Sequence, residues 1–210
     1  MKNPFKKNNY MLPVASINSI YVDDDKASDL FRLSIIIEEI NKNRDTLGIP
    51  LNVPNKDLLN VFNNLLISEF DSVKEKANEI AHSLGMRLAK VLKTLYKPSL
   101  LSVTNRKNWE KVHWDFWQTI HKIYFVGGVT APILVKIFYD EITKLFSQNN
   151  IENVQVIFIE ASNNLGTKGL SLITLDGSYL LFDFGQTTIK RTHFIKENNT
   201  PIIDLTLPNI

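Results

Sequence analysis

The stretch Leu181–Lys190, with the sequence LFDFGQTTIK, decides the fold because it reads as two strands joined by a tight, glycine-led turn. An apolar run leads into Asp183, and a second β-prone run begins at Ile189. The turn between them opens with Gly185 and carries two threonines. The pattern predicts a β-hairpin with a carboxylate at the end of its first strand and a lysine in its second.

The polar residues of this hairpin have the chemistry needed to hold phosphate. Gly185 lets backbone amides approach an anion closely, and the hydroxyls of Thr187 and Thr188 can donate to phosphate oxygens. Lys190 supplies a positive point charge. The carboxylate of Asp183 is costly at the end of an apolar strand, and a magnesium ion, bound directly or through water, would offset that cost. The alternative is an ordinary hairpin with a turn aspartate, and the hairpin alone leaves both open.

Working outward, the C-terminal half alternates strand, helix and strand before a meander. The expected elements are strands at Lys122–Val126 and Val154–Ile159 around a helix at Pro132–Phe146, and then strands at Leu170–Leu175, Tyr179–Phe184, Ile189–Ile195 and Ile202–Leu207. We expect Asp176-Gly177 to turn the first pair of these later strands.

The first half is predicted to be helical, because its apolar residues recur at three- and four-residue steps. Helices are expected at Asp29–Asn43, at Ser72–Tyr96 and, rich in tryptophan, at Asn105–Thr119. Another helix is expected to be capped by Asn55, with its inward residues being Leu58, Leu59, Phe62, Leu65 and Leu66. The run Ile17–Val22 is a candidate strand. We expect residues 1–104 to form the helical part and 105–210 to carry the hairpin, packed as one unit.

A second signal is the segment Tyr124–Thr130, YFVGGVT, in which a strand runs into paired glycines and then a helix. Gly127 and Gly128 let the backbone approach a flat or charged part of a ligand. Such a pair is also a common turn, so this segment is weak evidence alone.

Together the two motifs resemble those of the ROK family of sugar kinases and repressors, within the actin-like ATPases. Asp183–Lys190 resembles the family's first phosphate motif, Asp-x-Gly-Gly-Thr-x-x-Lys, with Gln186 at the usual second glycine. The segment Tyr124–Val129 looks like the adenosine motif. Asn163–Leu170 is similar to the segment that leads into the family's C-terminal helix, and Ala77–Pro98 to the helix before the adenosine strand.

The order of the motifs differs from that of the family, where the phosphate hairpin opens the chain and the adenosine motif comes late. We therefore expect an α/β, actin-like (ribonuclease H-like) fold that is circularly permuted, or partial with a C-terminal half beyond Ile210. Its first half would be helical, and its mixed sheet would end in a β-meander. A second phosphate loop, a catalytic aspartate and the family's His/Cys zinc cluster have no clear equivalent in this sequence.

The resemblance implies an ATP-binding sugar kinase that uses Mg²⁺ and transfers a phosphoryl group to a sugar hydroxyl. Asp183, Gly185, Gln186, Thr187, Thr188 and Lys190 would hold phosphate, with Asp183 also on the metal; Gly127, Gly128 and Val129 would lie at the adenosine end. The catalytic base stays unknown. The alternatives are a non-catalytic sugar- or nucleotide-sensing module of the same fold and a plain protein-interaction domain. A homodimer is a further expectation.

Composition excludes several other classes of protein. The net charge of +2 gives no basic stripe for nucleic acid, and the absence of cysteine excludes disulfides and thiolate metal sites. No apolar run is long enough to span a membrane, so we expect a cytoplasmic protein without nucleic-acid or membrane partners. The four histidines lack metal-ligand spacing. Trp109, Trp114 and Trp117 are expected to pack at a helix joint rather than to stack on a sugar or base.

Overall fold

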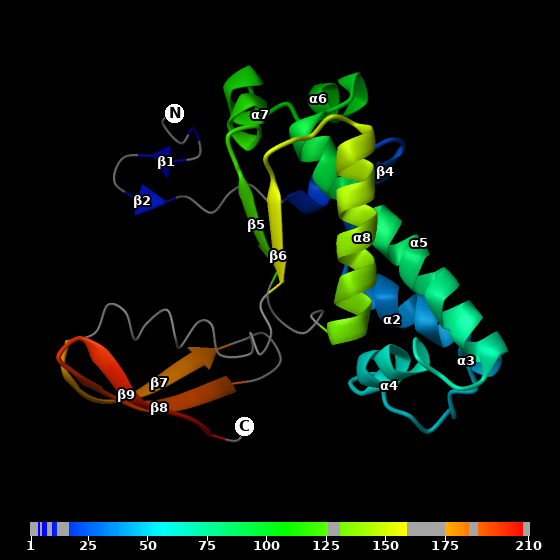
Figure 1. The fold of residues 1–210 in the computed structure, drawn as a ribbon. Coiled ribbons are helices and arrows are strands. Elements are labelled where there is room, and N and C mark those ends of the chain that lie inside the picture. Colours follow the sequence, from blue (N-terminus) through cyan, green and yellow to red (C-terminus); the bar gives the residue numbers. More distant parts are fainter. Residues whose placement is uncertain are drawn as a thin grey trace. The chain divides into compact units, whose positions relative to one another are not determined.

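The computed structural model describes residues 4, 6–7, 10–11, 17–125, 131–158, 175–184 and 189–207, with the backbone alone at 6–7, 10–11, 181–184, 189–192 and 201–207. The described part of the chain forms two compact units. The first contains the described residues up to 158, and the second contains 175–184 and 189–207. Residues on both sides of positions 104–105 therefore belong to the first unit. Figure 1 shows the elements of each unit.

Short elements open the first unit. They are β1 (Lys6–Lys7) paired antiparallel with β2 (Tyr10–Met11), the 3₁₀ helix η1 (Ile17–Ser19), β3 (Tyr21–Val22) paired antiparallel with β4 (Asp25–Lys26), and α1 (Ala27–Leu30). The run expected as one strand at Ile17–Val22 is thus a helical turn followed by a two-residue strand. Ile20 and Val22 are nonetheless buried, as their apolar side chains require.

Four helices follow, and the first lies within the predicted helix at Asp29–Asn43. They are α2 (Leu33–Lys42), α3 (Arg44–Leu47), α4 (Leu58–Leu65) and α5 (Asp71–Tyr96). The predicted helix is broken because Phe31 and Arg32 have extended backbones. The ring of Phe31 packs edge-on against Phe138 with centroids 5.6 Å apart, so a tertiary contact accompanies the break in the local helical pattern.

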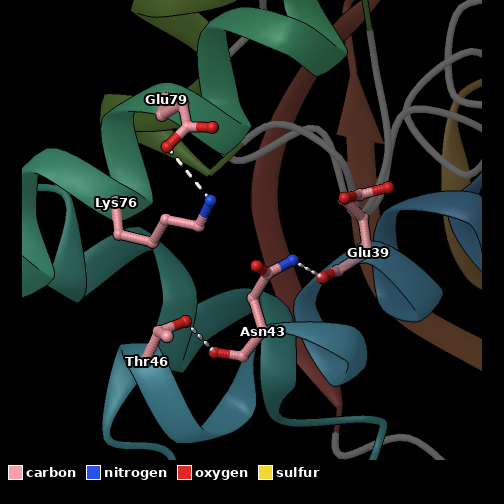
Figure 2. A network of polar contacts seen from close by, with 5 residues as sticks. All are labelled: Glu39, Asn43, Thr46, Lys76 and Glu79. Carbon is pink, nitrogen blue, oxygen red and sulfur yellow. Dashed lines mark hydrogen bonds and ion pairs between the residues drawn. The ribbon is translucent and has the colours of Figure 1, made fainter.

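The α2–α3 corner is held by side chains that bond to backbone groups. Asn43 Nδ2 donates to the Glu39 carbonyl at 2.8 Å, and Thr46 Oγ1 donates to the Asn43 carbonyl at 2.9 Å (Figure 2). The buried Arg44 guanidinium donates to the carbonyls of Pro50 and Val53 at 2.6 and 2.9 Å. These bonds hold the loop between α3 and α4 in place, although the loop has no regular secondary structure of its own.

Helix α5 is the centre of the first unit and packs along α8 (Pro132–Gln148), as Figure 1 shows. Small buried residues recur on α5 at steps of four: Ala77, Ala81, Gly85 and Ala89. A Cβ built at Gly85 would lie 3.2 Å from Phe138 Cδ1 and 3.2 Å from Glu141 Cγ. The close approach of the two helices therefore depends on this glycine. The predicted helix Ser72–Tyr96 is confirmed with its apolar stripe.

The predicted Trp-rich helix at Asn105–Thr119 is present only in its second half, as α7 (Lys111–Trp117). A separate helix, α6 (Leu100–Asn105), ends where the predicted one was expected to begin. Helix α7 begins after Glu110, whose backbone N–H donates to His113 Nδ1 at 3.0 Å and so caps the new helix. Trp109 and Trp114 are buried with ring centroids 4.8 Å apart, and Trp117 stacks on Trp109 at 6.1 Å. The tryptophans pack into the core, as expected.

A strand–helix–strand unit completes this part of the chain, confirming the predicted order. Strand β5 (Lys122–Phe125) pairs in parallel with β6 (Gln155–Phe158), and α8 connects them. Phe125 and Phe158 are register partners with stacked rings, 4.6 Å between centroids. No helix in the described ranges is long and apolar enough to cross a membrane.

The second unit is a three-stranded antiparallel meander in the order β7 (Gly177–Phe184), β8 (Ile189–Glu197), β9 (Thr200–Leu207). These strands agree with the predicted meander. The Asp176 carboxylate accepts from the N–H groups of Asn198 and Asn199 at 2.8 and 3.0 Å, which closes the β8–β9 turn. The hairpin turn predicted at Asp176-Gly177 stays a prediction. The expected strand at 170–175 lies almost wholly outside the described residues.

The described part of the chain is therefore a mixed α/β structure, with sheets of two or three strands. The actin-like ATPase fold stays a prediction.

Candidate functional site

The hairpin predicted to hold phosphate is present as a backbone structure at β7–β8. Asp183 of β7 and Lys190 of β8 are register partners, and the pair Phe184 and Ile189 closes the ladder before the connection. Directly opposed residues of an antiparallel pair have Cα atoms about 4.5–5.5 Å apart. The register thus brings the predicted metal-binding and phosphate-binding residues together on one rung. Gly185, Gln186, Thr187 and Thr188 lie outside the described residues.

Aromatic packing further along the strands accompanies this register. Tyr179 and Phe194 are register partners with stacked rings, 5.2 Å between centroids, and Phe194 is buried. A slip by one residue would move every side chain of a strand to the other face and expose Phe194. The pairing of Asp183 with Lys190 is therefore tied to the burial of an aromatic side chain four rungs away.

The second predicted motif, with Gly127, Gly128 and Val129, lies outside the described residues. The strand before it and the helix after it are described. Strand β5 ends at Phe125, and α8 begins at Pro132. Because β5 and β6 are parallel, their carboxyl ends meet at one edge, which is where ligands bind in open α/β sheets.

Asn63 of α4 accepts hydrogen bonds from backbone amides at the start of α8. Its Oδ1 accepts from the N–H groups of Ile133 and Leu134, both at 3.1 Å. Pro132 has no N–H, and Val135 N–H donates to the Ala131 carbonyl at 2.9 Å. The first-turn amides that could otherwise hold an anion are thus already paired. The geometry suits an uncharged ligand part better than a phosphate at this helix end.

Sequence reasoning missed Asn63, although a signal was present. The residue sits between Phe62 and Leu66 in the apolar stripe of α4 and is buried. A buried amide side chain is nearly always hydrogen-bonded. An asparagine on an apolar helix face therefore predicts a polar partner from another element.

Two other polar groups in the first unit bear on its electrostatics. Tyr96 of α5 donates its hydroxyl to the Ile120 carbonyl, just before β5, at 3.0 Å, and burial raises the pKa of Tyr96 to about 12. His82 Nδ1 lies 2.7 Å from Oε1 of the buried Glu141, which links α5 to α8. Neither group belongs to the two predicted motifs, and both join helices or strands of the core.

Among the described side chains, no group of three His, Asp or Glu residues is placed to hold a metal ion. The side chain of Asp183, on which the magnesium prediction rests, is outside that set. The magnesium site stays a prediction.

Comparisons of the chain with family models, with curated proteins and with solved structures found no match. Two features of the chain itself bear on its function: the β7–β8 register and the carboxyl edge of the strands β5 and β6.

Proposed function

We propose that this chain binds ATP with Mg²⁺ as a ROK-like, actin-like ATPase domain and transfers the γ-phosphoryl group to a sugar hydroxyl. The sugar oxygen attacks the γ-phosphorus, the bond from that phosphorus to the β,γ-bridging oxygen breaks, and ADP leaves. The hydroxyl proton passes to a base that we do not assign. The reaction would take place in the cytoplasm, where ATP and magnesium are available.

The observation that carries this proposal is the pairing of Asp183 with Lys190, the second-last rung of the β7–β8 ladder before the Gly-Gln-Thr-Thr connection. An ammonium and the connection's amides and hydroxyls suit the negative charge of the β- and γ-phosphates. A carboxylate on the same rung suits a magnesium ion, which keeps several waters and takes only one or two protein carboxylates.

The strand–helix–strand unit supports the adenosine end of the proposal. Its parallel strands bring the paired-glycine connection to their carboxyl edge, and the first-turn amides of α8 are already paired with Asn63 and Ala131. An adenosine moiety needs close backbone approach and has no charge to neutralise, which fits Gly127, Gly128 and Val129.

Calorimetric titration of the full chain with ATP-Mg²⁺ tests the proposal. We expect Lys190→Ala and Asp183→Ala to weaken ATP affinity at least about tenfold, because each removes a charge matched to the phosphates or the metal. Asp183→Ala should also lose most of the dependence on magnesium. Arg191→Ala is the matched control, because Arg191 is the next cation along β8 but pairs with Phe182.

Wild-type ATP affinity in both variants would remove the assignment of Asp183 and Lys190 to the site.

A second experiment, in which hexoses are added with ATP-Mg²⁺ and ADP release is measured, separates a kinase from a module that only senses its ligand. Tight ATP binding without sugar-dependent ADP would favour the sensing module.

A further inference from the structure

Three aromatic side chains form a row at the carboxyl ends of β5 and β6. Phe125 and Phe158 are the last residues of the two strands, and their rings are stacked with centroids 4.6 Å apart. The ring of Tyr139, from α8, stands edge-on to Phe158, with centroids 6.4 Å apart and an angle of 70° between the ring planes. The row therefore crosses both strands and reaches the helix that connects them.

The row runs from the core toward solvent. On α8, Phe138 is buried, whereas the next residue, Tyr139, is 41% exposed. Phe125 and Phe158 are half-buried, although Val156, on the same side of β6 as Phe158, is buried. The exposed part of the row is an aromatic surface at the edge where open α/β sheets bind their ligands.

The chemistry of this edge favours a flat ring without charge. Aromatic side chains stack on every nucleobase, because each base has a π face. The first-turn amides of α8 that could attract an anion already donate to Asn63. A base therefore suits the aromatic row better than a phosphate group does.

We propose that the adenine base of the bound nucleotide stacks on this row and that Tyr139 supplies the exposed ring. This inference rests on the proposed function and deepens it, because it names a base-binding side chain in the described part of the chain. The ring provides the interaction and the hydroxyl is not needed. Guanosine is therefore expected to lose affinity together with adenosine when the ring is removed.

The test compares adenosine, ATP-Mg²⁺ and inorganic tripolyphosphate with Mg²⁺ by calorimetry on the full chain. Tyr139→Leu keeps an apolar side chain but has no π face. It is expected to weaken adenosine and ATP binding at least about fivefold and to leave tripolyphosphate affinity within about twofold of wild type. Tyr139→Phe keeps the ring, and its three affinities should stay within about twofold of wild type.

Tyr124→Leu is the matched control. Tyr124 is 53% exposed and directly precedes Phe125, but the alternation of side chains along β5 places it on the other face of the sheet. The same chemical change at this position should leave all three affinities unchanged.

Three results would overturn the inference while leaving the proposed function standing. They are wild-type adenosine affinity in Tyr139→Leu, an equal loss of all three ligands in that variant, and a loss in Tyr139→Phe as large as that in Tyr139→Leu. A wild-type chain that binds none of the ligands would refute the proposed function itself, and this inference with it.

Discussion

Replacing Gly85 by alanine tests how closely α5 and α8 pack. An alanine Cβ would lie 3.2 Å from Phe138 Cδ1, 3.2 Å from Glu141 Cγ and 3.3 Å from Glu141 Cβ. Such distances are shorter than ordinary van der Waals contact, so the two helices or their side chains must shift. Overpacking of this kind costs about 1–3 kcal/mol.

The same substitution also has a favourable effect, because alanine is a better helix former than glycine by about 1 kcal/mol. The net expectation for Gly85→Ala is a fall in the free energy of unfolding of between about zero and 2 kcal/mol. Gly85→Leu adds three more carbons at the same place and should cost more. Ser83→Ala, at an exposed position on α5, is the control and should change stability by less than about 0.5 kcal/mol.

Urea denaturation followed by tryptophan fluorescence measures the effect. All three tryptophans, Trp109, Trp114 and Trp117, lie in the first unit, so the signal reports on the unit that contains α5 and α8. A rise in stability of about 1 kcal/mol for Gly85→Ala would equal the full gain in helix propensity. It would show that the helices have room for a methyl group, and the packing argument would be refuted.

Two further predictions concern Tyr96 and Asp176. Because burial raises the pKa of Tyr96 to about 12, the folded state disfavours its phenolate; the stability this contributes is complete below pH 10 and is lost as the pH rises toward 12. Urea midpoints measured from pH 8 to 11.5 should therefore fall more steeply in the wild type than in Tyr96→Phe, and parallel slopes would contradict the assignment. Asp176→Ala should destabilise the β8–β9 turn by about 1–2 kcal/mol, because it leaves the Asn198 and Asn199 amides without their acceptor. Faster amide exchange confined to β8 and β9, with Asp176→Asn close to wild type, would support that role, and unchanged exchange in Asp176→Ala would contradict it.

Periodic segments were predictable from the sequence. Helices α5 and α8 follow the three- and four-residue spacing of apolar residues that predicts a helix. Strands β5 and β6 are short apolar runs, and β8 and β9 are β-prone segments bounded by polar turns. The hairpin at β7–β8 was also predicted, and its register places Asp183 opposite Lys190. That register could not be derived with certainty because it depends on the packing of Tyr179 on Phe194.

The differences from prediction have both distant and local causes. Phe31 leaves the helical conformation while its ring packs on the distant Phe138, whereas a local capping contact between Glu110 and His113 sets the start of α7 inside the Trp-rich segment. Asn63 was missed because its partners are about 70 residues away in sequence. A single sequence shows that a buried amide needs a partner, but not which backbone groups provide it.

The capping of one helix by another limits how the gene could be divided. A fragment beginning at Asn105 would keep β5, α8 and β6 but lose Asn63 and the small-residue face of α5. Its central helix would start without an acceptor and expose the side chains of Phe138 and Glu141 that now lie against Gly85. Grafting of the strand–helix–strand unit onto another scaffold should therefore succeed only if α4 and α5 are transferred with it.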